Sequence, residues 1–182
     1  MLWKEPFLEC RLLAARLLGL VPVELAEPVI TQVNAWLDTS PEEHTLSAIL
    51  DEGLARMRQE RPELLLTLAR EWLADKRIVV QQDALRMLRH LASHQHTNHL
   101  PDVLQLITHL IRRVHPALRS DLLHVLARAA RTSPQETAFV LRQNLDAPDS
   151  PDTAWLVRQI ISEFPAPQQQ NLKSAMSKVR NP

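Results

Sequence analysis

Apolar residues recur every three or four positions along most of the chain, which is the period of an amphipathic α-helix. Within the stretch 61–91, two such patterns follow one another, separated by the charged turn at 75–77. The apolar positions are Leu65, Leu68 and Trp72 in the first pattern, and Val80, Ala84 and Leu88 in the second. Two short helices cannot bury both apolar sides alone, so we expect this pair to stack against similar pairs.

Helix-start signals divide the rest of the chain in the same way. The thirteen prolines occur singly, and several stand where the first turn of a helix tolerates them. The expected helices span 6–19, 28–37, 40–59, 62–74 and 78–91, and five more begin near 100, 116, 134, 151 and 166. Similar points in successive pairs recur roughly every 34 to 39 residues, at His44, Asp83, Ser120 and Ala154. The sequence predicts an all-α, HEAT-like α-solenoid of about ten helices in five antiparallel pairs, forming one domain over 1–182.

The first of these helices has its apolar residues Leu8, Leu12, Ala15 and Leu18 on one side. We expect that side to face the core. An exposed apolar edge on the same helix would instead indicate a protein partner or a dimer.

Composition supports a helical protein and excludes several functions. Two glycines and no tyrosine are too few for an all-β fold or for a glycine-rich phosphate loop. The 21 basic and 21 acidic residues balance, so DNA binding would need a local basic surface. A lone Cys10 fits a reducing compartment, and neither a membrane-spanning run nor a signal peptide is visible. We therefore expect a cytoplasmic protein without a membrane partner.

Two segments resemble a known family. LWKEPFLECRLLAARLL and PELLLTLAREWLADKRIVVQQDAL are similar to the AlkD-type HEAT-like-repeat alkylpurine DNA glycosylases of the DNA alkylation repair family. The shared residues include Leu2, Trp3, Pro6, Glu9, Pro62, Glu63, Leu64, Trp72, Ala74, Ile78, Gln81 and Ala84. The resemblance fades after about residue 145 and implies a further helical segment before Leu2.

The resemblance also implies positions for the catalytic residues. In the family, a Trp with an Asp four residues later, an Arg and a second Trp surround the damaged nucleotide, and the Asp stabilises positive charge on the sugar. These positions fall at Glu43, Ser47, Gln82 and His124 in this chain, so all four differ. Asp51 and Asp38 are nearby acids, but neither follows a Trp at that spacing. We expect no catalytic residue by the family mechanism.

The expected helices that contain Gln82 and His124 also predict a basic surface. Spacings of three place Arg86 and Arg89 on one side of a helix, and Arg128 and Arg131 on one side of another. Such arginines suit phosphate contacts that position a duplex without specifying its bases. The alternative is a solvated surface of mixed charge. Duplex DNA and another protein are therefore the candidate partners, and no small-molecule cofactor is expected.

Other candidate chemistry is weak. His90, His94, His96 and His99 lack a thiolate partner and have only one nearby carboxylate, so we expect a solvated segment and no metal site. Ser47 and His44 lie three apart without an orienting acid, which does not predict a nucleophile. The four tryptophans stand on apolar sides and are expected in the core.

The sequence thus predicts a HEAT-like-repeat binding or scaffold protein of the DNA alkylation repair family, non-catalytic and with a surface for duplex DNA. One alternative is a diverged DNA glycosylase that excises alkylated purines with Asp51 and Glu43. The second is a protein interaction solenoid with no role on DNA.

Overall fold

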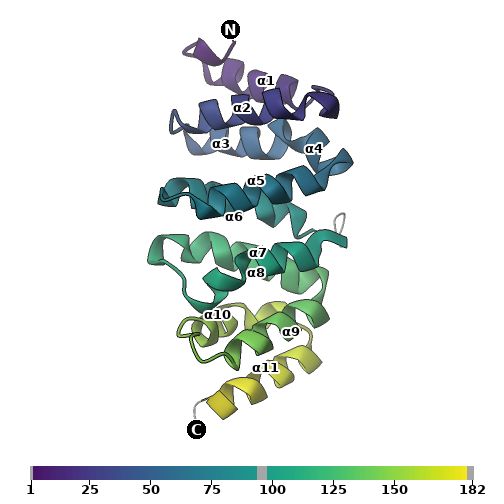
Figure 1. Cartoon of the computed structure of the whole chain (residues 1–182), viewed down its shortest axis with the longest axis vertical. Coiled ribbons are helices and arrows are strands. Elements are labelled where there is room, and N and C mark those ends of the chain that lie inside the picture. Colours follow the sequence, from purple (N-terminus) through teal and green to yellow (C-terminus); the bar gives the residue numbers. More distant parts are fainter. Residues whose placement is uncertain (1, 94–97, 180–182) are drawn as a thin grey trace. The chain divides into compact units, whose positions relative to one another are not determined.

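The computed structural model describes residues 2–93 and 98–179 of the 182-residue chain, and in these ranges all regular secondary structure is helical (Figure 1). Eleven α-helices are present there. They are α1 (Leu8–Leu18), α2 (Ala26–Leu37), α3 (Glu43–Ala48), α4 (Ala55–Glu60), α5 (Pro62–Ala74), α6 (Ile78–Leu91), α7 (Leu100–Arg112), α8 (Arg119–Thr132), α9 (Pro134–Leu145), α10 (Thr153–Ile160) and α11 (Ala166–Val179). The predicted all-α architecture of helical repeats is confirmed. None of the described helices is long and apolar enough to cross a membrane.

The chain divides into two compact units. Unit 1 is Met1–Thr67 and unit 2 is Leu68–Pro182, so the boundary lies within α5. Each unit is described by itself below. That residues 1–182 form a single domain stays a prediction.

In unit 1, α1 packs against α3 and the π-helical turn η3 (Ile49–Gly53). The approach is close at Gly19, which follows α1. A Cβ atom added there would lie 1.9 Å from the carbonyl oxygen of Glu52. Because real Cβ atoms do not come that near to backbone oxygen, the contact between α1 and η3 requires glycine.

The helix predicted over 40–59 is not continuous, and this is a correction. The turn η3 separates α3 from α4, which accounts for eleven helices where about ten were expected. A π turn leaves backbone carbonyls without their usual partners. The Arg58 guanidinium donates to two of them, the carbonyl oxygens of Leu50 at 3.1 Å and Asp51 at 2.5 Å. Burial lowers the pKa of Arg58, and the charge of Asp51 opposes that shift.

The start of α3 also differs from expectation. The Ser-Pro-Glu-Glu segment at 40–43 has the sequence of a capping box, with Ser40 as the cap. In the structure Ser40 has φ of 51°, and the N-cap of α3 is Glu42. The left-handed backbone at Ser40 therefore ends the preceding turn and leaves Ser40 two residues from the helix start.

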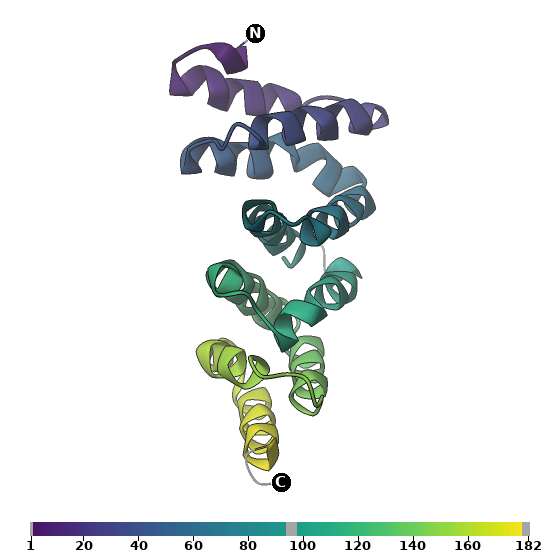
Figure 2. The same cartoon turned by 60° about the vertical axis from the view of Figure 1, so that its left-hand side comes forward.

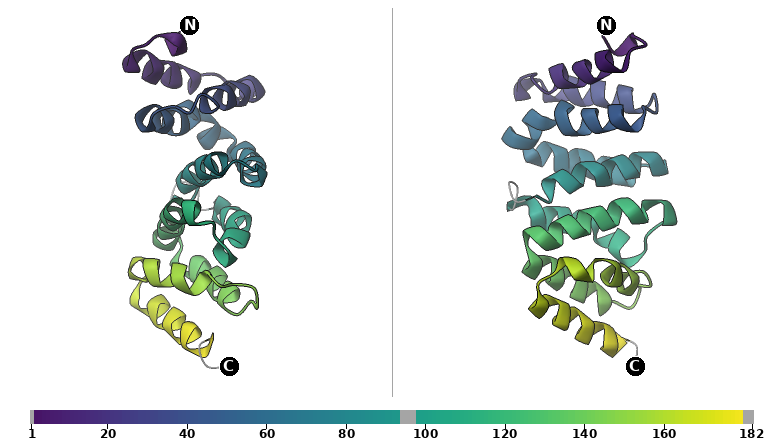
Figure 3. Two further views of the ribbon diagram at one scale, coloured as in Figure 1. Left: turned by 90° about the vertical axis from the view of Figure 1, so that its left-hand side faces the viewer. Right: turned by 180° about the vertical axis from the view of Figure 1, so that it is seen from behind.

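In unit 2 the helices form two rows. One row contains α6, α8 and α10, and the other contains α7, α9 and α11. Figure 2 shows α8 and α10 on one side and α7 and α9 on the other, and Figure 3 gives two further views. The equivalent points Asp83, Ser120 and Ala154 fall in α6, α8 and α10, so they lie in one row. Fully buried side chains between the rows include Leu85, Met87, Leu88, Leu104, Ile107, Ile111, Leu122 and Leu126.

Polar contacts join the end of α7 and the start of α8 to the start of α10. Asp152, just before α10, accepts the Val114 backbone N–H at 2.9 Å and an Arg119 N–H at 3.4 Å. Its own backbone N–H donates to the carbonyl oxygen of Arg112 at 3.2 Å. The Thr153 hydroxyl donates to the carbonyl oxygen of Ile111 at 2.9 Å. These contacts fix the register of neighbouring helix pairs.

The charged turn predicted between α5 and α6 is present. The Asp75 carboxylate accepts the Arg77 backbone N–H at 2.8 Å and two hydrogen bonds from its guanidinium. The Gln81 amide donates to the carbonyl oxygen of Asp75 at 2.7 Å. Hydrogen bonds from Arg77 hold the pKa of Asp75 below its usual value.

Candidate nucleic-acid interface

The four arginines predicted to contact DNA lie on neighbouring helices of one row. Arg86 and Arg89 belong to α6, whereas Arg128 and Arg131 belong to α8. The two helices pack together, and the Gln82 amide of α6 donates to the carbonyl oxygen of Ala117 just before α8 at 3.0 Å. Arg86 is partly buried and the other three are exposed. The structure therefore brings the four residues to one pair of helices.

Two of these arginines are held by carboxylates. The Arg86 Nε atom lies 3.5 Å from Asp121, and its Nη1 atom lies 3.8 Å from the buried Asp83. Arg131 pairs with Glu163. Only 28 % of the Arg86 side chain is exposed, against 52 % for Arg131. Arg86 thus serves the contact between α6 and α8, and less of its charge is available to a ligand.

The other two arginines are available. Arg89 and Arg128 are exposed, and neither forms an ion pair with another residue in the described ranges. Arg158 on α10 shares both properties and was missed by the sequence analysis. The signal was its place four residues after Ala154, which is the place that His124 has after Ser120 in the preceding repeat. Each of α6, α8 and α10 therefore carries one exposed arginine without an ion pair in the described structure.

Hydrogen bonds between neighbouring helices of the row show which of their positions correspond. The contacts between α6 and α8 join residues 35 apart, and those from α8 to Asp152 and Glu163 join residues 33 and 32 apart. By these offsets, Arg89 corresponds in sequence to His124, and Arg158 corresponds to Val125. Arg128 follows one turn further along α8. His124 is exposed as well.

The charge of the row is positive overall. The helices α6, α8 and α10, counted together with the neighbouring Asp152 and Glu163, contain six arginines and four carboxylates. The row therefore has a formal excess of two positive charges. The charged side chains are Arg86, Arg89, Arg119, Arg128, Arg131 and Arg158, with Asp83, Asp121, Asp152 and Glu163. Each carboxylate lies within 4 Å of an arginine. The excess therefore resides on the exposed arginines, although the whole chain is neutral.

The four positions implied by the family mechanism lie in different units. Gln82 and His124 belong to unit 2, where Gln82 bonds to backbone and His124 is exposed. Glu43 and Ser47 belong to unit 1, where both are exposed on α3. Within unit 2 neither position offers the arginine or the tryptophan that the resemblance implies.

The alternative acid Asp51 sits in the turn η3 and is half-buried. Its backbone carbonyl accepts a hydrogen bond from Arg58, and its charge acts to raise the pKa of Arg58 against the larger effect of burial. The nearest tryptophan in sequence, Trp36, is stacked on Trp3 with ring centroids 4.2 Å apart and is 8 % exposed. Trp36 and Trp72 are buried, as predicted, whereas Trp155 carries the Arg119 guanidinium 4.9 Å above its ring.

The histidine segment of the sequence analysis is described only in part. His94 and His96 lie outside the described residues, and His90 and His99 lie within them. Among described residues no three His, Cys, Asp or Glu side chains are grouped as metal ligands. A hollow of about 560 Å³ lies between α7 and α9 on the other row.

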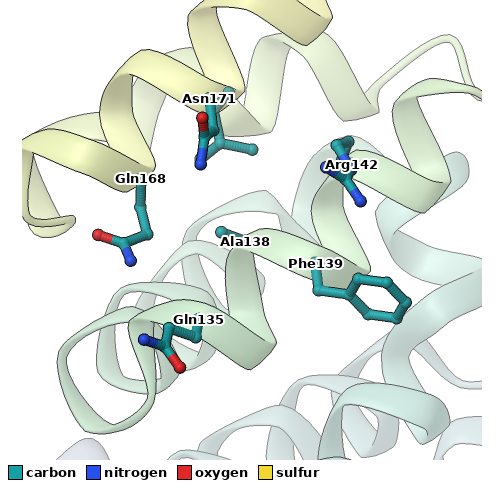
Figure 4. A pocket seen from close by; sticks show the side chains of 7 residues that line it. Gln135, Ala138, Phe139, Arg142, Gln168 and Asn171 are labelled. Carbon is teal, nitrogen blue, oxygen red and sulfur yellow. The ribbon is translucent and has the colours of Figure 1, made fainter.

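A smaller hollow of about 220 Å³ lies between α9 and α11. Figure 4 shows Gln135 and Ala138 of α9 on one side of it and Gln168 and Asn171 of α11 on the other, with the Phe139 ring turned away from α11. The Arg142 guanidinium lies 6.0 Å from the centre of the Phe139 ring. Amide groups and one arginine line this hollow among the described residues, without an acid or a nucleophile.

The family comparison agrees with the fold. Residues 1–151 match the family model described as DNA alkylation repair enzyme. No curated protein and no solved structure matches the chain. The match spans well over half of the 182 residues and ends just before α10. The chain therefore belongs to the DNA alkylation repair family.

Proposed function

We propose that this protein binds duplex DNA through its phosphates, on the row formed by α6, α8 and α10, and does not excise bases. One observation carries the proposal: each helix of that row has an exposed arginine without an ion pair in the described structure, namely Arg89, Arg128 and Arg158. Exposed guanidinium groups bind phosphate oxygens and release counterions from the duplex. Arg86 and Arg131 take part secondarily, because each shares its charge with a carboxylate.

The family supports DNA as the partner, and the substituted positions support the absence of excision. Gln82 and His124 supply neither the positive charge nor the indole ring that the family mechanism implies. A binding protein needs only backbone contacts, which the arginines provide without specifying sequence. We place this binding in the cytoplasm.

The test is a titration of a labelled duplex by fluorescence anisotropy over a range of salt concentrations. Arg89→Ala with Arg128→Ala should weaken binding about tenfold at low salt and should lower the slope of log affinity against log salt by about two. Arg142→Ala, on α9 of the other row, is the matched control and should leave both quantities unchanged. Failure of the wild-type protein to bind at low salt, or equal effects of the three changes, would overturn the proposal.

Excision is tested on the same protein with a duplex that carries N7-methylguanine. We expect no released base by chromatography after prolonged incubation. Release that Asp51→Asn or Glu43→Gln abolishes would instead establish the alternative, a diverged glycosylase. Both acids lie in unit 1, away from the proposed arginines in sequence, so the two outcomes are distinguishable.

A further inference from the structure

Most of the large exposed apolar side chains in the described ranges lie within the first 25 residues of the chain. Of the nine large apolar side chains that are exposed in the described ranges, seven lie there. They are Leu2, Phe7, Leu8, Leu13, Leu17, Leu20 and Leu25, with exposed fractions from 37 % to 69 %. Concentrated apolar surface of this kind marks an interaction site.

Part of this surface is a stripe along α1 and the turn that follows it, which we call the outer stripe: Glu9, Leu13, Arg16, Leu17 and Leu20. The first four positions are separated by one, three or four residues, so they share the side of α1 opposite the buried Ala14 and Ala15, and Leu20 lies in the turn just after α1. Leu13 and Leu17 are each about half exposed. The stripe therefore has an apolar centre and a charge of each sign.

A hollow lies beside the outer stripe. It holds about 510 Å³, and Leu17, Val21 and the stacked rings of Trp3 and Trp36 line it. Its floor is aromatic and already formed, so a leucine or phenylalanine of a partner could enter without repacking. Phe7 and Leu20 are exposed side chains of that size on the same unit.

The charges of the outer stripe are self-complementary. If two copies of α1 lie antiparallel and cross between residues 12 and 13, residue 9 of each copy lies opposite residue 16 of the other. Glu9 then faces the partner's Arg16 twice, and Leu13 lies next to the symmetry axis. Arg16 already pairs with Glu52, but 65 % of its side chain is exposed, which leaves donors for a second carboxylate.

We propose that the outer stripe is the interface of a symmetric dimer of this chain, with the two α1 helices antiparallel. A two-fold axis requires a surface that complements itself, and the order Glu9, Leu13, Arg16 meets that requirement. Stable interfaces bury about 800 Å² per partner around an apolar centre. Three of the seven exposed apolar side chains, Leu13, Leu17 and Leu20, belong to the outer stripe and provide such a centre. The proposal uses residues of unit 1 and is independent of the proposed DNA contacts in unit 2.

Sedimentation velocity over a concentration series tests the dimer. The wild-type chain should approach twice its mass of 20.8 kDa as concentration rises. Leu13→Glu should shift the midpoint to at least about tenfold higher concentration, because it places two carboxylates at the axis. Val79→Glu introduces the same charge at another exposed apolar side chain, 57 % exposed on α6, and is the matched control that should leave the midpoint unchanged. Circular dichroism checks that each variant is folded.

A charge exchange tests the antiparallel arrangement. Glu9→Arg alone or Arg16→Glu alone should weaken self-association about tenfold, because each puts like charges opposite one another twice. Mixing the two variants should restore association, because every facing pair is then an arginine and a carboxylate. A monomer across the series, or a mixture no stronger than its components, overturns the proposal and leaves the surface to a different protein.

Discussion

The two units keep neighbouring helices together by different means. In unit 1, α1 meets η3 through a close approach of backbone at Gly19, and Arg58 holds the carbonyls of the π turn. In unit 2, Asp152 and several arginine–carboxylate pairs join successive repeats. The close backbone contact at Gly19 requires that no side chain be present there. An ion pair instead requires two side chains, one of each charge. The same repeated architecture thus has different points of weakness in its two units.

Their surfaces differ correspondingly. Unit 2 exposes arginines on one row of its helices. Among its described residues, the only large apolar side chains that are exposed are Val79 and Phe139. Unit 1 exposes seven such side chains near its start. Charge on unit 2 suits a polyanion, and apolar surface on unit 1 suits a protein. The binding surface for DNA and the surface for self-association are therefore expected on separate units.

The largest effect on stability should come from Gly19→Ala. The new methyl group would overlap the carbonyl oxygen of Glu52, so α1 and η3 must separate. We expect a loss of about 1–3 kcal/mol in the free energy of unfolding, measured in urea. At Gly53 the nearest atom to an added Cβ is 3.5 Å away, so Gly53→Ala is the control and should cost less than about 1 kcal/mol. Equal losses would show that the close approach is not what matters.

Asp152→Ala should weaken unit 2 by a comparable or smaller amount. The change leaves the Val114 backbone N–H and Arg119 without their acceptor, at a cost of about 1–2 kcal/mol. Asp149→Ala removes a more exposed carboxylate that pairs with Arg113, and should cost less than about 0.5 kcal/mol. Urea unfolding of the two variants measures the difference, and a larger loss for Asp149→Ala would contradict the role of Asp152.

The smallest effect should be a change in the acid dependence of stability. The folded state holds the pKa of Asp75 below its unfolded value, so this group stabilises the protein above the unfolded pKa, and the contribution is lost as pH falls through the folded pKa. Asp75→Asn should therefore flatten the decline of melting temperature in that acid range. Asp146→Asn, at the end of α9, is the control. A wild-type slope in Asp75→Asn would exclude the contribution of the turn.

Much of the fold was predictable because helix periodicity and proline placement are local properties. The stretch 61–91 illustrates this: both helices and the turn at Asp75 lie where the pattern placed them. The break at 49–53 was not predictable, since the apolar spacing continues through it and only packing against Gly19 distinguishes a π turn there. Ser40 was misplaced as a cap for a similar reason, because its left-handed backbone depends on the chain around it.

The candidate site was predictable in part. Spacing placed Arg86, Arg89, Arg128 and Arg131 on two helices, but could not show which of them meet carboxylates 32 to 35 residues away. Those carboxylates lie on the next repeat. The register between repeats therefore decides which arginines form ion pairs and which remain available to bind phosphate. Arg158 was missed because its helix is short and follows the part that resembles the family.

By itself, the sequence determined an all-α chain of repeated helix pairs and its membership of the DNA alkylation repair family. Each of these depends on residue identity and on spacing along the chain. Only the tertiary structure decided that Leu8 is more than one-third exposed although its pattern predicted burial, and that Arg89, Arg128 and Arg158 have no ion-pair partner among the described residues. Exposure and charge pairing depend on neighbours distant in the chain, which local periodicity does not specify.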